Sequence, residues 1–245
     1  MRISRIYYPG KLTVGSIVAL EDAASHHIAT VLRMRVGAAI ILFNDQGGEY
    51  RAQIKNILKH KTEVELLEFI DIDRESPLQI YLGQGVSRGE RMDYTIQKAV
   101  ELGVTHITPL ITERCGVNLS QERWEHRWQH WQAVVLGACE QSGRTRVPRL
   151  DKPLPLVNWL VQTMPGSKLV LAPDAELALN EAVTDQQAFT LLMGSEGGLS
   201  DAEIALAKAQ QFQPCKLGPR ILRTETAAVS VISILQNRFG DLNRI

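Results

Sequence analysis

Two short glycine-containing turns hold the residues whose types and spacing are best suited to bind a ligand. The first is MGSEGGLSDAE, residues 193–203. It contains three glycines within five residues: Gly194, Gly197 and Gly198. Glycine is used where the backbone needs a positive φ or where another group must approach it closely. An apolar run precedes the turn, and Ser200 stands three residues before Glu203, the spacing of a helix capping box. The stretch predicts a strand, a backbone-lined turn and a helix, a place where α/β proteins often bind ligands.

The familiar glycine-rich motifs do not match this turn. A P-loop requires a lysine after its last glycine, and none follows here. A dinucleotide-binding GxGxxG lies in the first strand–turn–helix unit, whereas this turn comes late in the chain. A nucleophile elbow has the form GxSxG, but Gly194 directly precedes Ser195. A glycine-rich connection without a ligand therefore remains an alternative for this turn.

The second turn, LGPRILRTETAA at residues 217–228, concentrates charge between an expected strand and an expected apolar helix. Its charged residues are Arg220, Arg223 and Glu225. Charges this dense between buried elements are costly unless they pair or contact a ligand. An Arg–Glu pair that caps the last helix would account for Glu225 alone. Two such turns in succession therefore favour a ligand site.

Three other patterns favour structure over chemistry. His126 and His130 have the i, i+4 spacing of a metal site, but Arg127 stands where the zincin motif needs glutamate. An apolar stripe at helical spacing is more typical of a core or a dimer contact than of a base-stacking surface. Its residues are Trp124, Trp128, Trp131 and Val135. Cys139 has no neighbouring histidine in the sequence and is interpreted as a structural thiol.

Composition sets broad limits on the function. The chain has 27 basic and 27 acidic residues, so its neutral charge argues neither for nor against nucleic acid. The opening MRISRIYYPG lacks the apolar core of a secretory signal, and the apolar run at 38–43 is too short to span a bilayer. The three cysteines lie far apart without a CxxC motif: Cys115, Cys139 and Cys215. We therefore expect a cytoplasmic protein without a membrane span or a disulfide framework.

The elements that must position the two turns fall into two segments. Residues 1–72 are rich in strands, with a hairpin turn expected at 45–48 and a short helix within 21–34. The polar stretch DIDRESP, residues 71–77, is the best candidate for a domain boundary. In residues 73–245 strands alternate with helices, a pattern typical of a mostly parallel sheet covered on both faces.

Several stretches together closely resemble one family. MGSEGGLS and LGPRILRTETA, with ELGVTHITPLITERCGV and ACEQSGR upstream, are similar to motifs of the RsmE family, and the likeness runs from RISRIYYP to RFGDL. Its members are SPOUT-superfamily methyltransferases that use S-adenosylmethionine to methylate N3 of one uridine in 16S ribosomal RNA of the small subunit. One departure is Ser195, where many members have proline. It should leave the backbone amides of the turn available.

The resemblance implies an α/β fold in two domains. Residues 73–245 would form a SPOUT methyltransferase domain with a mostly parallel sheet and a deep trefoil knot, although general topology rules argue against knots. Residues 1–72 would form a small PUA-like β-barrel that binds RNA. The resemblance further implies a homodimer with the active site near the subunit interface. We expect the reaction to require no metal ion.

In such a fold, three loops would converge and hold the cofactor largely through backbone groups. The cofactor-binding residues implied by the resemblance are Leu171, Ala172, Pro173, Met193, Gly194, Glu196, Gly197, Gly198, Leu217, Gly218, Ile221, Leu222, Thr226 and Ala227.

Methyl transfer to N3 of uracil requires loss of a proton, which spreads negative charge onto the carbonyl oxygens. A fixed arginine can stabilise that charge. Arg223 is the first candidate, with Glu225 orienting it or assisting proton removal, and Arg114 is a third candidate. The candidates for RNA contacts are Arg5, His27, Arg33, Arg35, Arg88 and Arg91.

Two other functions stay open at this stage. One is a non-catalytic RNA-binding assembly factor that kept the fold. The other is an α/β enzyme that uses a different adenine nucleotide. Titration with S-adenosylmethionine, S-adenosylhomocysteine, ATP and NAD separates these possibilities.

Overall fold

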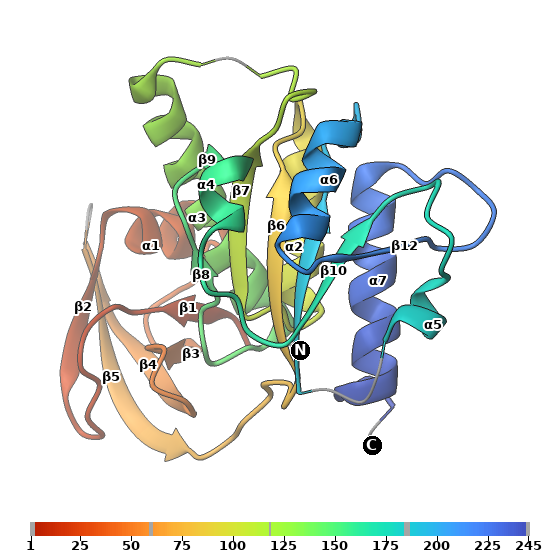
Figure 1. Ribbon diagram of the computed structural model, residues 1–245. Helices are drawn as coiled ribbons and strands as arrows, with labels where there is room; N and C mark the ends of the chain where they lie inside the picture. The colour runs from red at the N-terminus through yellow and green to blue at the C-terminus, as the bar shows by residue number, and fades with distance from the viewer. Residues whose placement is uncertain (1–2, 59–60, 118, 184–186, 244–245) are drawn as a thin grey trace. The chain divides into compact units, whose positions relative to one another are not determined.

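The chain divides into two compact units in the computed structural model, which describes residues 3–58, 61–117, 119–183 and 187–243 (Figure 1). The N-terminal unit combines Met1–Glu75 with Cys139–Val147, and the C-terminal unit combines Ser76–Ala138 with Pro148–Ile245. Each unit has its own sheet.

The N-terminal unit contains a five-stranded sheet in the order β1-β3-β4-β5-β2. Its strands are β1 (Arg5–Tyr7), β2 (Ile17–Glu21), β3 (Ala39–Phe43), β4 (Glu49–Ile57) and β5 (Lys61–Ile70). β1 pairs with β3 in parallel, and the other neighbours are antiparallel. β3 and β4 are joined by a turn in which Asp45, Gly47 and Gly48 have φ angles of 65°, 85° and 68°. The hairpin expected at 45–48 is therefore confirmed.

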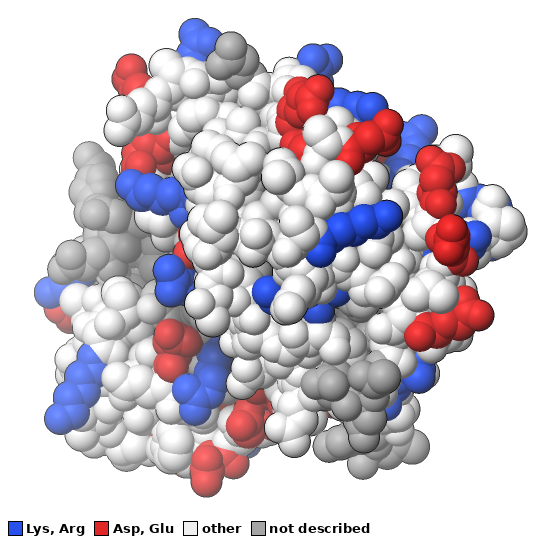
Figure 2. Space-filling view, viewed as in Figure 1, with Lys and Arg blue, Asp and Glu red and all other residues white. Residues whose placement is uncertain are grey.

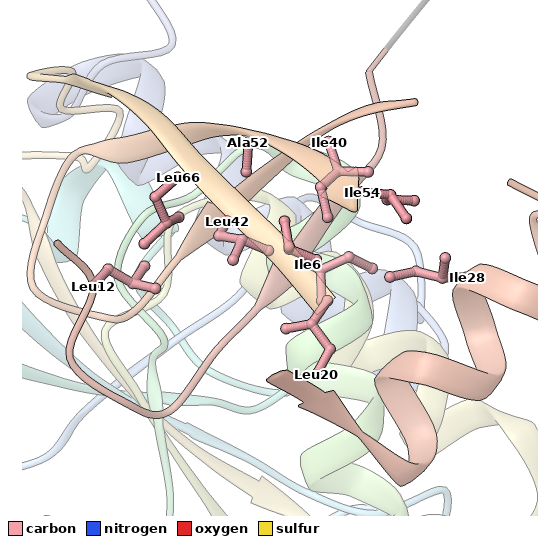
Figure 3. Close-up of a cluster of buried hydrophobic side chains, with 10 residues drawn as sticks. Ile6, Leu12, Leu20, Ile28, Ile40, Leu42, Ala52, Ile54 and Leu66 are labelled. Carbon is pink, nitrogen blue, oxygen red and sulfur yellow. The ribbon is translucent and has the colours of Figure 1, made fainter. Parts of the chain in front are cut away.

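The core of this unit draws on all five strands and on one helical segment. α1 (Asp22–His26) and a π-helix (His27–Val31) occupy the region where a single helix was expected. Ile28 from the π-helix is fully buried among the strand residues, as Figure 3 shows. Along β4, Ala52 and Ile54 are buried while Arg51 and Lys55 are exposed, the period-two pattern of a half-buried strand.

Residues 139–147 are bound to the rest of the N-terminal unit by polar contacts. The Arg144 guanidinium lies 2.6 Å from a carboxylate oxygen of Glu75. The Val147 amide donates to Asp45 at 2.6 Å, and the Tyr7 amide donates to Glu140 at 3.0 Å. This segment thus belongs to a unit whose remaining residues lie more than sixty positions earlier in the sequence.

The C-terminal unit contains a parallel sheet in the order β12-β10-β11-β6-β7-β8, with β9 beside β7. Its strands are β6 (Gln79–Gly85), β7 (His106–Ile111), β8 (Arg149–Leu150), β9 (Leu154–Pro155), β10 (Ser167–Leu171), β11 (Ala188–Met193) and β12 (Gln213–Cys215). All neighbouring strands are parallel. The parallel sheet expected from strand–helix alternation is confirmed, while β8 and β9 carry too few residues to show a periodic pattern.

Helices cover both faces of this sheet (Figure 1). The helices are α2 (Glu90–Glu101), α3 (Gln121–Ser142), α4 (Leu156–Leu160), α5 (Leu179–Ala182), α6 (Asp201–Ala209) and α7 (Thr224–Phe239). Trp159 of α4 and Ala207 of α6 pack with Leu192 of β11 in one buried cluster. Phe189 of the same strand contacts Phe239 of α7, with ring centroids 5.5 Å apart, and α7 packs against α2. Since Phe189 and Leu192 are three positions apart, they face opposite sides of the sheet.

The parallel arrangement brings the connections that follow the strands to one edge of the sheet. The carboxyl ends of parallel strands lie at the same edge, where open α/β sheets bind their ligands. β6, β10, β11 and β12 end there, and each is followed by a connecting segment. Both glycine-containing turns found in the sequence are among these segments, since they follow β11 and β12.

Candidate functional site

A pocket of about 710 Å³ lies at this edge, entirely within the C-terminal unit. Three segments supply most of its lining: 171–175 at the end of β10, 193–199 at the end of β11, and 216–225 from the end of β12 into the first turn of α7. The pocket contains every cofactor residue expected from the sequence except Thr226, together with Arg223, Glu225 and Arg114. The two turns are therefore parts of one site.

Two glycines of the first turn, Gly194 and Gly197, are required by packing of the backbone. A Cβ atom on Gly194 would lie 2.6 Å from the carbonyl carbon of Gly198. A Cβ on Gly197 would lie 2.8 Å from the Cβ of Arg114. Gly85, at the end of β6, meets the same turn, since a Cβ there would lie 2.4 Å from the Ser195 nitrogen.

Gly198 and Gly218 have a different reason to be glycine. They have φ angles of 71° and 67°, and apart from their chain neighbours no atom of the described residues lies within 4 Å of a Cβ built on either of them. Both line the pocket, so their backbones face open space. These two glycines leave room for a ligand to approach the main chain, whereas Gly194 and Gly197 pack against protein.

A capping box fixes the start of the helix after the first turn. The Ser200 hydroxyl accepts a hydrogen bond from the Glu203 amide at 3.2 Å, and the Glu203 carboxylate accepts one from the Ser200 amide at 2.9 Å. The spacing in the sequence predicted this pair, and it is confirmed. The second carboxylate oxygen of Glu203 accepts the Glu113 amide at 2.8 Å. The cap thus also binds the segment after β7 to the glycine turn.

Arg114 reinforces the same connection. One guanidinium nitrogen donates to the carbonyl oxygens of Gly197 and Leu199 at 3.3 and 3.2 Å. The Ser195 hydroxyl donates to the Arg114 carbonyl at 3.0 Å. These contacts hold the backbone of the turn, so the third catalytic candidate directly supports the first glycine-containing turn.

A chain of charges crosses the pocket from the first turn to α7. Glu196 accepts hydrogen bonds from the Arg88 amide at 2.8 Å and from Arg91 at 2.9 Å. Arg91 also lies 4.0 Å from Glu225. Burial opposes ionisation of Glu196, but the hydrogen bonds from the backbone and from Arg91 outweigh it and lower its pKa. Arg91, expected as an RNA contact, therefore links two carboxylates of the site.

Arg223 differs from Arg91, Glu196 and Glu225, the pocket charges that interact with one another. It is the N-cap residue of α7, its side chain is exposed, and its guanidinium has no hydrogen-bond or ion-pair partner among the described residues. The carboxylate of Glu225 is paired with Arg91 instead, and its second oxygen, Oε2, is buried without a hydrogen-bond partner in the described parts of the chain. Arg223 thus remains available to an incoming anionic group.

Several pocket residues were missed by reasoning from the sequence. The ones that carry a charge are Asp174, Asp201, Lys208 and Lys216, whereas Arg220 was noted as part of the second turn without a role of its own. Asp201, Ile204 and Lys208 recur at three and four positions along α6, so helical spacing was a usable signal for this face. Gln84 was also missed; it is fully buried at the end of β6 and contacts both turns.

The basic residues expected to contact RNA occupy different environments. Arg5 is 8% exposed, pairs with Glu49 and donates to the Arg144 carbonyl, which gives it a structural role in the N-terminal unit. Arg33 and Arg35 are exposed, and His27 is half-buried. Arg88 is exposed and donates to the Gly116 carbonyl at 3.0 Å. Figure 2 shows basic and acidic side chains interspersed on the visible face. An RNA-binding surface on this face would therefore consist of small clusters of basic residues.

The patterns interpreted as structural have partners within the protein. His130 and Trp131 both bind the carboxylate of Asp93, at 2.7 and 3.1 Å. Trp131 and Val135 are buried in the core. Burial raises the pKa of the Cys139 thiol to about 12, which makes it an inert group. In the described parts of the chain, no three His, Cys, Asp or Glu residues gather as metal ligands would.

Comparisons with known proteins identify the family to which this chain belongs. Residues 74–236 match the family described as an RNA methyltransferase domain, and residues 20–67 match the RNA methyltransferase PUA domain. The chain belongs to this RNA methyltransferase family. A ribosomal RNA small subunit methyltransferase E from Buchnera aphidicola is 38% identical, over 99% of this chain and 99% of its own length. The protein of the same name from Bacillus subtilis is 30% identical over 86% of each chain.

Solved structures of similar proteins match the fold of this chain over nearly its whole length. A ribosomal RNA small subunit methyltransferase E from Neisseria gonorrhoeae, bound to S-adenosylmethionine, is 40% identical with a TM-score of 0.90, covering 98% of this chain and 100% of that chain. A Legionella pneumophila protein with bound S-adenosylmethionine is 40% identical with a TM-score of 0.96, covering 99% and 100%. The predicted fold class, a SPOUT methyltransferase domain with a small PUA-like domain, is confirmed. No helix of the described residues is both long enough and apolar enough to cross a membrane.

Proposed function

We propose that this chain transfers a methyl group from S-adenosylmethionine to N3 of a uridine in 16S ribosomal RNA. The observation that carries the proposal is the pocket in which all the cofactor candidates except Thr226 and the three catalytic candidates meet. Membership of the RNA methyltransferase family supports the reaction type. The names of the similar proteins support the small-subunit RNA as the substrate.

The pocket residues fit the proposed cofactor. Gly198 and Gly218 present open backbone, which suits the polar edges of an adenosine group. Asp174, Asp201 and Lys208 supply charges of both signs for the ammonium and carboxylate of an amino-acid end. When bound, the sulfonium group supplies an electrophilic methyl group. The protein's contribution is to hold that methyl group and the uracil nitrogen within reach of each other.

Two side chains are proposed to act on the uracil. Arg223 has no partner in the described structure and lines the pocket, so it would stabilise the negative charge that develops on the uracil oxygens. Glu225 would assist removal of the N3 proton, with Arg91 holding its carboxylate. Arg114 would act through the loop that it supports.

The partners and the setting are part of the same proposal. The N-terminal unit would bind RNA, because part of it matches the PUA domain of RNA methyltransferases. The chain would act as a cytoplasmic homodimer, with residues 1–72 and 73–245 as its domains. The reaction as proposed has no step that uses a metal ion.

The test uses small ribosomal subunits from a strain that lacks this activity. The purified protein and labelled S-adenosylmethionine are incubated with intact subunits and, separately, with deproteinised 16S RNA. Nucleosides are then analysed by mass spectrometry, and 3-methyluridine is the expected product. Methylation of another base, or no transfer to either substrate, contradicts the proposal. Parallel titrations with ATP and NAD should show no binding that competes with S-adenosylmethionine.

A further inference from the structure

One buried polar side chain joins the two turns of the pocket without lining it. Gln84 is the second-last residue of β6 and is 1% exposed. Its amide nitrogen donates to the Thr224 hydroxyl at 2.9 Å and to the Gly194 carbonyl at 3.2 Å. The Thr224 hydroxyl donates in turn to the same Gly194 carbonyl at 2.6 Å. Three segments that are 110 and 140 residues apart thus meet in a closed triangle of hydrogen bonds.

The position of Thr224 gives this triangle its importance. Thr224 is the first residue of α7 and stands between Arg223 and Glu225. The N-cap residue Arg223 forms no side-chain cap, so the hydroxyl of Thr224 supplies the side-chain bond that fixes the start of the helix. Because a helix is stiff, fixing its first residue also fixes the direction in which the neighbouring side chains leave the backbone.

Because Gln84 is buried, its hydrogen bonds explain why a glutamine stands at this position. A buried amide that lacks hydrogen bonds is destabilising, so a buried amide whose bonds are made indicates that those bonds serve a purpose. The oxygen of Gln84 has no partner among the described residues, whereas its nitrogen has three acceptors: Gly85, Gly194 and Thr224. An apolar side chain would fill the same space without leaving an oxygen unpaired. The donor function of the amide is therefore the feature that distinguishes glutamine at this position.

We infer that Gln84 is a positioning residue for methyl transfer, which acts through Thr224 to set Arg223 and Glu225 against the base while it fixes the cofactor turn at Gly194. This inference rests on the proposed function. Misplacement of a catalytic group by about 1 Å can reduce a rate by about a hundredfold, even when the mutated residue does not touch the substrate. The expected signature is a fall in the rate of the chemical step without a matching loss of cofactor affinity.

The test compares Thr224→Val, which removes the hydroxyl, with Thr224→Ser, which keeps it. Gln84→Leu and the double variant complete a cycle. Single-turnover methylation should fall about ten- to a hundredfold in Thr224→Val and in Gln84→Leu. It should stay within about threefold of the wild type in Thr224→Ser, and the double variant should lose little more than either single variant. The dissociation constant of S-adenosylmethionine should change less than the rate in every variant.

A second readout does not depend on activity. Hydrogen exchange of the amides in residues 217–228 should accelerate in Thr224→Val and Gln84→Leu, and remain at the wild-type level in Thr224→Ser. The inference is overturned if Thr224→Val transfers methyl at the wild-type rate, if Thr224→Ser loses as much as Thr224→Val, or if the rate falls only as far as cofactor affinity falls. If the wild-type protein itself forms no 3-methyluridine, the proposed function fails, while hydrogen exchange still reports whether the triangle orders α7.

Discussion

At the level of single residues, the most informative side chain is Arg223. It lies in a pocket whose other central charges, Arg91, Glu196 and Glu225, already interact with one another. We predict that Arg223→Ala lowers single-turnover methyl transfer by about a hundred- to a thousandfold, the typical cost of losing one donor that stabilises transition-state charge. Affinity for S-adenosylmethionine should stay nearly unchanged, because the guanidinium makes no hydrogen bond that holds a described loop.

Arg223→Lys is the matched variant for this prediction. It keeps the charge but replaces a planar fork of donors with a single ammonium group, so only part of the rate should return. Rates on small subunits and cofactor titrations are measured on the same protein samples. If transfer falls no further than cofactor affinity, Arg223 belongs to the cofactor cradle, and Arg114 becomes the stronger catalytic candidate.

Asp151 gives a residue-level prediction about pH and stability. It accepts bonds from Thr108 at 2.9 Å and Arg149 at 2.8 Å and lies 2.6 Å from His106 Nε2. Burial opposes ionisation of Asp151, but the contacts with His106, Thr108 and Arg149 outweigh it and lower its pKa. A lowered folded-state pKa contributes stability above the unfolded value of about 3.9, and this contribution disappears as pH falls through the folded value.

The corresponding variant is Asp151→Asn. We expect it to lower the free energy of unfolding at pH 7 by about 1 to 2 kcal/mol, after allowance for solvent screening of a half-buried group. The wild type should lose more stability than the variant between pH 5 and the folded-state pKa, so the two curves converge in acid. Urea unfolding across this range measures both effects. Parallel curves for the two proteins would show that Asp151 is not the group that titrates.

At the level of elements, the glycine turn after β11 controls the pocket. A Cβ on Gly197 would meet both the Cβ and the carbonyl oxygen of Arg114, at 2.8 and 3.0 Å. Gly197→Val should therefore push the turn away from the segment after β7 and sharply reduce affinity for S-adenosylmethionine. Isothermal titration measures the affinity, and circular dichroism checks that the fold persists.

Gly137→Ala is the control for this prediction. Gly137 lies in α3 and is exposed, and a Cβ built on it would meet no described atom within 4 Å outside the neighbouring backbone of its own helix. Alanine there should stabilise the helix by about 0.5 to 1 kcal/mol and leave cofactor binding unchanged. Unchanged affinity in Gly197→Val would contradict the prediction. It would mean that the turn can move away from Arg114 without disturbing the pocket.

At the level of the whole molecule, RNA recognition is proposed to involve both units. In the N-terminal unit, Arg33 and Arg35 are exposed, and their guanidinium groups have no hydrogen-bond or ion-pair partner among the described residues. Replacing both by alanine should weaken binding to 16S RNA. The slope of log affinity against log salt should become shallower by about 0.7 to 0.9 for each phosphate that the variant no longer neutralises. Cofactor affinity should not change.

The control for the arginine pair is Arg51→Ala. Arg51 belongs to the same unit and is also exposed, but it pairs with Glu68 at 3.0 Å. Its removal should leave the salt dependence of RNA binding close to that of the wild type. Filter binding over a range of salt concentrations distinguishes the variants. An equal slope in all three proteins would place the RNA surface elsewhere.

The extent of the two units differs from the domain boundary that the sequence predicted. The polar stretch at 71–77 predicted a boundary after residue 72, and the division into 1–72 and 73–245 stays a prediction. The N-terminal unit as observed extends to Glu75 and also includes residues 139–147. The Arg144–Glu75 pair and the Val147–Asp45 hydrogen bond join these distant parts. Such contacts leave no local pattern, because each partner is an ordinary polar residue in its own stretch of sequence.

The sequence by itself determined the features that depend on neighbours along the chain. These include the capping box at Ser200, the hairpin at 45–48, the period-two burial of β4 and the strand–helix alternation that gives the parallel sheet. It also carried the family motifs, so that most of the pocket lining could be predicted.

Tertiary structure alone decided which distant groups meet. It placed Gln84 between Gly194 and Thr224, assigned Arg91 to Glu196 and Glu225, and buried Arg5 against Glu49. The physical reason is that a hydrogen bond or ion pair acts over about 3 Å of space and is indifferent to separation along the chain. Only the folded sheet, by collecting the carboxyl ends of its strands at one edge, brings these groups within that distance.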